Sequence, residues 1–185
     1  MIAHFVLDEK VTSQIIENFG KNNNNSFFIV FSKESIESLR FIGNPPQNLI
    51  CFNEDLDDIN RIIDKIDPNS LVVHAFHLEF ARIILKIKKQ LKIVWYTWGF
   101  DIYGLPRIKP HTYAPITNNY LLERTPNLRL RRFILKNDFL RKVYFSINKN
   151  EVDRYSIIFR SLKKVSYMST YLKEDFLIFS KYYPN

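Results

Sequence analysis

The sequence predicts an α/β fold, in which a Rossmann-like parallel sheet is flanked by helices and a helical excursion follows the fifth strand. Short apolar runs, typical of strands buried on both faces, alternate in the N-terminal half with segments of helical periodicity. Residues 70–104 are the clearest unit, because an apolar run, an amphipathic segment and a second apolar run follow one another there. A strand, helix and strand of this length form a right-handed crossover between parallel strands.

The elements follow in order along the chain. The five expected strands span residues 2–7, 26–31, 49–52, 71–73 and 93–96. We expect Asp8 to cap a helix that continues through Phe19, and Asn53 to cap a second helix from Glu54 to Ile66. Apolar residues spaced three and four apart predict a third helix over residues 80–91.

Past Gly104 the pattern changes. Residues 105–119 contain three prolines and are predicted to be irregular. Helices are then expected over residues 119–136, 138–147 and 152–163, and we call residues 119–163 the basic helical segment. A short strand over 165–169 and a closing helix over 171–182 complete the prediction.

Length and composition favour one domain, spanning residues 1–185, in a reducing compartment. A 46% hydrophobic chain of 185 residues can bury one substantial core. No apolar run reaches the roughly 18 to 20 residues that cross a bilayer, and the N-terminus lacks a signal-peptide pattern. The single cysteine, Cys51, excludes an intramolecular disulfide. These features predict a cytoplasmic location.

The charge predicts an anionic partner. The formal net charge is +8, which favours nucleic acid, an acidic membrane surface or a phosphorylated substrate. Residues 128–144 carry many of the cations, with one acid and with interleaved apolar residues, as in a basic amphipathic surface helix. The alternative is an ordinary solvated helix face. The basic residues of this stretch are Arg129, Arg131, Arg132, Lys136, Arg141 and Lys142.

A site is predicted where the fourth and fifth strands end, because ligands of open parallel sheets bind outside the carboxyl ends of the strands. His74 could hydrogen-bond a substrate or act as a base, or it could have a structural hydrogen bond. Asp101 could deprotonate an acceptor hydroxyl or hold sugar hydroxyls, or it could cap a short helix. Trp98 and Tyr103 could stack on a sugar, or they could belong to the core. His77 is more typical of a helix N-cap.

Cofactor and metal sites are not expected. The chain has four glycines, and none stands in a Gly-x-Gly-x-x-Gly or Walker arrangement. Two of them, Gly99 and Gly104, bracket the loop after the fifth strand, which suggests a need for backbone freedom or close ligand approach there. His74 and His77, three residues apart, could form a metal pair, but His4 and His111 are distant in sequence and the chain has no His-Glu-x-x-His or paired-cysteine pattern.

The stretch VVHAFHLEFARIILKIKKQLKIVWYTWGFDIYGLP resembles the TDP-N-acetylfucosamine:lipid II N-acetylfucosaminyltransferase family. That family has a strand-end histidine followed by a helix and a Trp-x-x-Trp-Gly-x-Asp-x-Tyr motif. His74 is similar to the histidine, and the motif is matched by Trp95, Trp98, Gly99, Asp101 and Tyr103. Position 75 is Ala where family members have Gly, which leaves the backbone less free.

The resemblance implies the N-terminal, acceptor-side domain of a GT-B glycosyltransferase. Asp101 and His74 would be catalytic, and Trp98, Gly99, Tyr103 and His77 would bind substrate. The acceptor would be a polyprenyl-diphosphate-linked saccharide at the cytoplasmic membrane face, and the basic residues of 128–144 would contact anionic lipid or the diphosphate.

GT-B enzymes are larger than this chain, so the expected donor-binding domain for the nucleotide sugar is absent and the chain by itself is expected to be inactive. The alternative is a non-catalytic basic α/β module that binds an anionic membrane surface or nucleic acid. Nucleic acid is the weaker choice, because the sequence has no nucleic-acid-binding motif.

Overall fold

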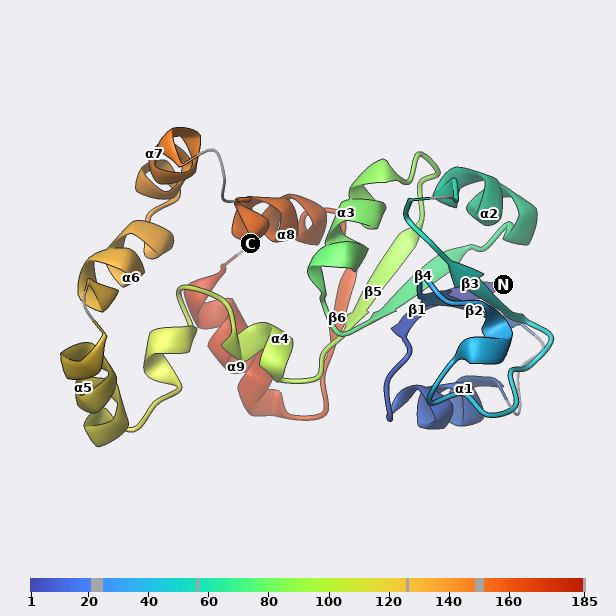
Figure 1. Cartoon of the computed structure of the whole chain (residues 1–185), viewed down its shortest axis with the longest axis horizontal. Helices are drawn as coiled ribbons and strands as arrows, with labels where there is room; N and C mark the ends of the chain where they lie inside the picture. The colour runs from blue at the N-terminus through green and yellow to red at the C-terminus, as the bar shows by residue number, and fades with distance from the viewer. Residues whose placement is uncertain (21–24, 56, 126, 149–151, 185) are drawn as a thin grey trace.

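The computed structural model describes residues 1–20, 25–55, 57–125, 127–148 and 152–184, and these residues form one six-stranded sheet (Figure 1). The strand order is β3-β2-β1-β4-β5-β6, and every neighbouring pair is parallel. The strands are β1 (Ile2–Leu7), β2 (Ser26–Phe31), β3 (Leu49–Phe52), β4 (Ser70–His74), β5 (Lys92–Tyr96) and β6 (Tyr167–Ser169). This order is that of dinucleotide-binding Rossmann domains, so the predicted Rossmann-like α/β fold is confirmed.

Helices cover both faces of the sheet (Figure 1). They are α1 (Thr12–Gly20), α2 (Ile59–Ile66), α3 (Leu78–Lys86), α4 (Phe100–Tyr103), α5 (Pro115–Arg124), α6 (Leu128–Lys136), α7 (Asp138–Ile147), α8 (Arg154–Leu162) and α9 (Lys173–Tyr182). Two short 3₁₀ helices, η1 (Ile36–Ser38) and η2 (Lys109–His111), lie in connections. The expected short sixth strand and closing helix are thus present.

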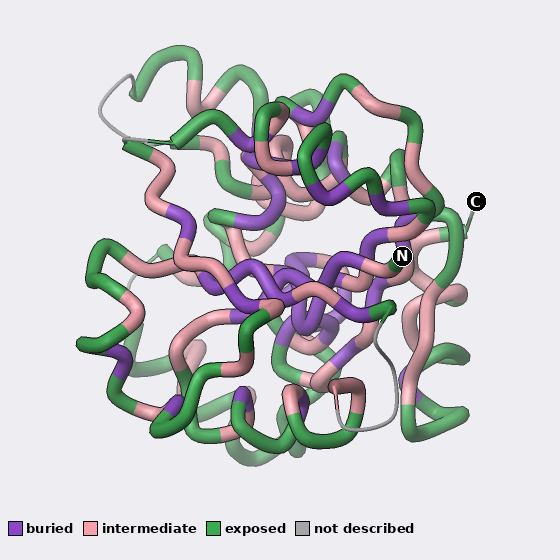
Figure 2. The backbone as a smooth tube through the Cα atoms, turned by 90° about the vertical axis from the view of Figure 1, so that its right-hand side faces the viewer, coloured by how far each residue is buried: buried purple, intermediate pink, exposed green. Residues whose placement is uncertain are grey.

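Alternating residues of each strand point to opposite faces, and both faces are largely apolar. On the face covered by α2 and α3, Phe5, Leu71 and Trp95 are buried with Phe80 of α3. The opposite face packs Phe28 and other strand residues against α1. Figure 2 shows the resulting concentration of buried residues along the middle of the molecule. Burial on both faces explains why the strands read as continuous apolar runs.

Two predicted helix starts are wrong, because Asn53 and Asp8 make other hydrogen bonds. Helix α2 begins at Ile59 and is capped by Asp58, whose Oδ1 accepts the backbone N–H of Asn60 at 2.9 Å. Asn53 belongs to a preceding turn. Asp8 does not cap α1, since its carboxylate accepts the backbone N–H groups of residues 40 and 41 at 2.7 and 3.0 Å.

After β5 the chain leaves the sheet, as predicted, and α5, α6 and α7 form a column beside the body (Figure 1). We call these three helices the arm. The predicted helix over 119–136 is divided, because α5 ends at Arg124 and α6 begins after Asn127, whose φ of 61° is left-handed. Residues 126 and 149–151 of the basic helical segment lie outside the described residues.

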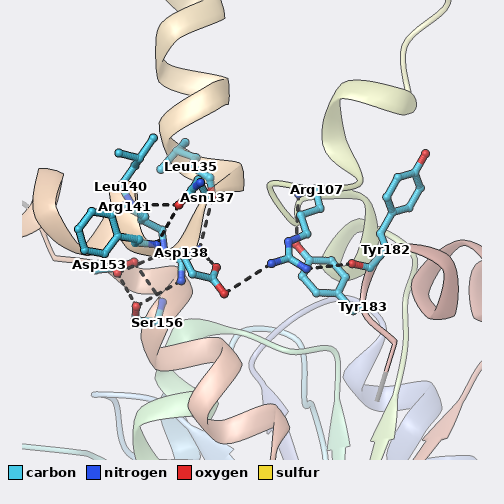
Figure 3. A network of polar contacts seen from close by, with 11 residues as sticks. Arg107, Leu135, Asn137, Asp138, Leu140, Arg141, Asp153, Ser156, Tyr182 and Tyr183 are labelled. Carbon is cyan, nitrogen blue, oxygen red and sulfur yellow. Dashed lines mark hydrogen bonds and ion pairs between the residues drawn. The ribbon is translucent and has the colours of Figure 1, made fainter.

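A buried arginine joins the arm to α8 (Figure 3). Arg141 of α7 is 3% exposed, and its guanidinium donates to Asp138 at 2.8 Å and to Asp153 at 3.3 Å. Asp153 also caps α8 by accepting the backbone N–H of Ser156 at 3.1 Å. Asp138 in turn accepts from Arg107 at 3.5 Å, which links the arm to the loop after α4. Arg141 therefore has an internal role and does not lie on the surface.

Replacing Arg141 by Leu should lower the free energy of unfolding by about 3 kcal/mol, because the change leaves Asp138 and Asp153 without their shared cation. The measurement is urea denaturation followed by circular dichroism. Lys142→Leu is the matched control, since the neighbouring side chain is exposed, and it should change stability by less than about 0.5 kcal/mol. Equal effects of the two variants would contradict the assigned role of Arg141.

Candidate functional site

The strand order reverses between β1 and β4, and a small cavity lies at the carboxyl ends of these two strands. From β1 the chain proceeds to β2 on one side, whereas from β4 it proceeds to β5 on the other. The cavity has a volume of about 130 Å³ and opens to solvent. The lining comes from the carboxyl ends of β1 and β4, from the loops after β1, β4 and β5, and from α1 and α4; it consists of Val6, Leu7, Glu9, Val11, Thr12, Ile15, His74, Ala75, His77, Trp98 and Phe100. We call it the switch-point cavity, because ligands of such sheets bind where the order reverses.

Two buried histidines form a pair at this cavity. Nδ1 of His4 in β1 lies 3.1 Å from Nε2 of His74 in β4. The side chains are 1% and 4% exposed, and the His4 ring packs between Phe19 and Phe28 at 5.0 Å from each ring centre. Since His4 stands beside Val72 in the parallel register, His74 follows two residues later on the same face of the sheet. The pairing of β1 with β4 thus brings the histidines together.

Each histidine has one nitrogen without a partner. Nε2 of His4 and Nδ1 of His74 have no hydrogen bond among the described residues. A neutral imidazole has one donor and one acceptor nitrogen, so the bond between the rings couples their tautomers. If Nδ1 of His4 donates to Nε2 of His74, then Nδ1 of His74 carries a proton and is a donor. If Nε2 of His74 donates instead, Nδ1 of His74 is an acceptor. The buried Nδ1 of His74, a residue of the cavity lining, can therefore act as either a donor or an acceptor toward a group that reaches it.

Burial keeps both rings neutral. It lowers the pKa of His4 to about 4, and burial together with the neighbouring His4 lowers the pKa of His74 to about 3. An imidazole with so low a pKa is a weak base at neutral pH. The pair is consequently better suited to hydrogen-bonding a ligand than to taking up a proton.

The carboxylate of Asp101 joins the loops that follow β4 and β5. Its Oδ2 accepts the backbone N–H of Phe76 at 3.0 Å and the indole N–H of Trp95 at 2.7 Å, and its Oδ1 accepts the backbone N–H of Trp98 at 3.1 Å. Burial raises the pKa of Asp101, while the bonds from Trp95, Trp98 and Phe76 act in the opposite direction. With both oxygens engaged and no part in the cavity lining, Asp101 is placed to position the loops. Its predicted catalytic role stays a prediction.

Both loops contain a left-handed residue. Ala75 has φ of 62° and Gly99 has φ of 82°, and each follows the end of a strand. A left-handed conformation costs a residue with a Cβ atom roughly 1–2 kcal/mol, whereas glycine adopts it freely. Position 75, where the family that the chain resembles has Gly, therefore has a backbone conformation that glycine adopts more easily than alanine.

The other predicted substrate residues divide into two groups. His77 and Trp98 line the cavity, and His77 is also the N-cap residue of α3, as its sequence position indicated. Tyr103 lies elsewhere, because its hydroxyl donates to Asp175 of α9 at 2.5 Å. The structure therefore brings His74, His77 and Trp98 together and separates Tyr103 from them.

Sequence reasoning missed His4 and Glu9. His4 lies inside a strand, where a lone histidine gives no signal until the neighbouring strand is known. Glu9 lines the cavity from the loop after β1, where we expected only the start of a helix. Its position directly after a strand end was the available signal. Glu9 is the one carboxylate among the described residues that line this cavity.

The basic residues of 128–144 also separate. Arg131 and Arg132 line a second, larger cavity between the arm and the body. Arg129 and Lys142 are exposed, and Lys136 is half-buried, outside that lining. With Arg141 buried, this set does not form a single basic face.

Within the described residues, no three His, Cys, Asp or Glu side chains come together as a metal site would require. None of the described helices has the length and apolar character needed to cross a membrane. Comparisons of the chain with models of protein families, with characterised proteins and with solved structures gave no match.

The histidine pair should make stability depend on pH. The unfolded chain binds protons at these residues below the ordinary pKa of 6.5, and the folded chain does so only near pH 4 and below. The free energy of unfolding therefore falls as the pH falls through this window. From pH 7 to pH 5 we expect a loss of about 2 kcal/mol for each histidine, measured by urea denaturation.

In the same experiment, His4→Phe should remove about half of this pH dependence. Phe19→Leu is the control, because it alters the packing around His4 without removing a titrating group. It should lower stability at every pH and keep the wild-type slope. Equal stability of the wild-type protein at pH 7 and pH 5 would contradict the neutral pair.

The left-handed residues give a second test. Ala75→Gly should leave the free energy of unfolding unchanged or raise it by up to about 1 kcal/mol, because relief of the left-handed cost exceeds the entropic cost of glycine. Gly99→Ala should lower it by about 1–2 kcal/mol. An added Cβ there would meet Tyr103 only at 3.5 Å, an ordinary contact, so the loss would be conformational.

Ala81→Gly, in the buried interior of α3, is the matched control and should cost about 1 kcal/mol or more. Thermal and urea unfolding of the three variants measure these differences. An Ala75→Gly variant as unstable as Ala81→Gly would rule out the strain assigned to position 75.

Proposed function

We propose that this chain is the acceptor-side domain of a glycosyltransferase and that a sugar of the acceptor binds in the switch-point cavity. The observation that carries the proposal is that His74, whose buried Nδ1 has no hydrogen-bond partner among the described residues, belongs to the lining of a cavity where a Rossmann-like sheet reverses its strand order. The Trp-x-x-Trp-Gly-x-Asp-x-Tyr resemblance supplies the reaction class.

The chemistry of the cavity supports a neutral, hydroxyl-rich ligand. His74 can donate to a hydroxyl or accept from one, depending on the tautomer of its pair with His4. Trp98 supplies an aromatic surface of the kind on which sugar rings pack, and Glu9 supplies a carboxylate. A volume of about 130 Å³ is small beside the 300–1,000 Å³ typical of drug-sized ligands, which favours a single ring over a dinucleotide.

In this proposal the residues have distinct roles. His74 orients an acceptor hydroxyl, and Glu9 is the candidate to accept its proton, because it has the one carboxyl group among the described residues that line this cavity. Asp101 positions the loop that carries Trp98 by holding three N–H groups. The nucleotide-sugar donor would be bound by a second Rossmann-like domain, as in the GT-B architecture.

The proposal includes peripheral attachment at the cytoplasmic membrane face, where a lipid-linked saccharide acceptor would be presented. The arm supports this part, because Phe139 and Ile147 of α7 are 72% and 74% exposed and the basic Arg129 and Lys142 are exposed nearby in sequence. Exposed apolar residues with interspersed cations suit an anionic bilayer surface. The same features also fit the alternative of a non-catalytic membrane-binding module.

Sugar binding can be tested by NMR, because the chain has only two tryptophans and their indole N–H signals are easily assigned. Titration with N-acetylglucosamine should shift the Trp98 indole and the His74 ring signals. His74→Phe should weaken binding about tenfold, equivalent to about 1.4 kcal/mol, through loss of the hydrogen bond.

Tyr103→Phe is the control for this titration, because it removes a hydroxyl that bonds Asp175 away from the cavity. Its affinity should equal that of the wild type. Unchanged Trp98 and His74 signals at saturating sugar would overturn the proposal. If the protein binds anionic vesicles but does not bind the sugar, the non-catalytic membrane-binding module is favoured.

A further inference from the structure

A second cavity, much larger than the first, lies between the arm and the body. Its volume is about 800 Å³. One wall is formed by α6 and α7 of the arm, and the other by α3, α8 and the segment around η2, beside which the arm stands in Figure 1. We call it the arm cavity. No residue of the switch-point cavity lines it, so the two are separate sites.

Cations from both walls face the arm cavity. Arg82 comes from α3, Lys109 from η2, Arg131 and Arg132 from α6, and Arg154 from α8. Among the described residues that line the cavity there is no Asp or Glu. Positive charges gathered around one hollow repel one another, and a bound anion removes that cost.

Most of these cations are not engaged by acids of the protein itself. The guanidinium of Arg132 donates to Asn118 at 2.6 Å. The side chains of Arg82, Lys109, Arg131 and Arg154 form no ion pair with any described carboxylate. These four side chains are therefore available to an external anionic group.

The rest of the lining is largely aromatic and aliphatic. Tyr113, Tyr144, Phe145 and Tyr155 contribute rings, and leucine side chains come from α3, α5 and α6. Arginine and tyrosine are the residue types enriched at protein-protein interfaces, where they supply much of the binding energy. A ligand that covers this lining needs apolar side chains as well as negative charge.

The shape of the cavity selects among anionic partners. A bilayer presents a flat surface, which cannot meet cations on both walls of a hollow. A small inorganic anion would leave the rings and leucines uncovered. A single helix or extended segment of a protein is narrow enough to lie between two walls of helices, and it can present carboxylates and apolar side chains together. Arginine pairs well with a carboxylate, through two parallel hydrogen bonds.

The acids around α2 do not favour a second copy of this chain as the partner. Three of them, Glu54, Asp55 and Asp67, already form ion pairs with lysines of their own chain. Their negative charge is therefore neutralised locally, and a different protein is the better source of free carboxylates.

We propose that the arm cavity is a docking site for an acidic segment of another protein, in which leucine or aromatic residues stand among the carboxylates. The carboxylates pair with Arg82, Lys109, Arg131 and Arg154, and the apolar side chains pack on the rings and leucines. The exposed arm residues that we assign to a membrane surface lie outside this lining, so both contacts are possible at once. This inference depends on the arm cavity alone and would stand if the sugar site were disproved.

The test is selection of binding peptides from a phage-displayed library of random dodecapeptides on the immobilised whole chain. Selected sequences should be enriched in Asp and Glu together with Leu or aromatic residues, because both parts of the lining need a partner. The best sequence, made as a fluorescein-labelled peptide, should bind with a Kd of about 100 μM or tighter and more weakly as salt is added. Selection of sequences without this enrichment would overturn the proposal.

The decisive variant is Arg131→Gln combined with Arg154→Gln, which should weaken the labelled peptide at least tenfold in fluorescence anisotropy. Both side chains are exposed, so folding should be retained, and circular dichroism checks this. Arg129→Gln combined with Lys142→Gln removes the same charge from exposed positions outside the cavity lining and should leave the affinity nearly unchanged. Equal losses in the two double variants would overturn the assignment of the cavity.

Two altered peptides separate the parts of the lining. Replacing Asp and Glu of the selected peptide by Asn and Gln should weaken binding at least tenfold, and so should replacing its leucine and aromatic residues by Ser. If the second peptide binds as well as the original, the attraction is one of charge alone and the proposed docking site is wrong.

Competition identifies the class of partner. Unlabelled peptide should displace the labelled one, whereas anionic vesicles and single-stranded oligothymidylate should not do so at matched charge. Displacement by either would overturn the proposal, in favour of a membrane or a nucleic acid. His74→Phe should have no effect on peptide binding, and the Arg131 and Arg154 variant should have none on sugar binding. Failure of one proposal is thereby distinguished from failure of the other.

Discussion

The site depends on one buried carboxylate. Asp101 accepts hydrogen bonds from the backbone of the loop after β4, from the backbone of the loop after β5 and from the indole of Trp95 within β5. Neither loop has a regular partner for these N–H groups, and an unsatisfied buried donor costs about 1–3 kcal/mol. By satisfying all three, Asp101 holds the loops in the conformations that place His74 and Trp98 at one cavity. The left-handed Ala75 and Gly99 lie within the same arrangement.

The fold could be predicted from the sequence because its signals are local. Apolar runs bounded by turn residues predicted five strands, and their alternation with helical periodicity predicted parallel pairing. Helix starts were less predictable, since several acids stand near each one. Asp8 and Asn53 had the right chemistry for caps, but Asp8 instead binds two backbone N–H groups of a distant loop, which no local pattern indicates. The division between α5 and α6 depends likewise on the backbone of Asn127.

The candidate site was predictable only in part. The strand-end rule located His74, His77 and Trp98 correctly at one edge of the sheet, because it needs only the strand assignments. It could not find His4, whose meeting with His74 requires that β1 and β4 be neighbours in a particular register. It also could not predict that the Tyr103 hydroxyl bonds Asp175 of α9 outside the cavity. Nor could it predict that Arg141 is buried and bonded to Asp138 and Asp153. In each case the deciding partner is remote in sequence.

The arm differs from the body in what holds it together. Along α5, α6 and α7 the only described residue that is fully buried is Arg141, so polar contacts replace an apolar core there. A unit of this kind opens at a lower free energy than a sheet whose strands are buried on both faces, and its amide protons exchange sooner. Any molecule that bridges the arm and the body would raise that opening free energy in proportion to its binding. Slowed hydrogen exchange confined to these helices would therefore report occupancy of the space they enclose.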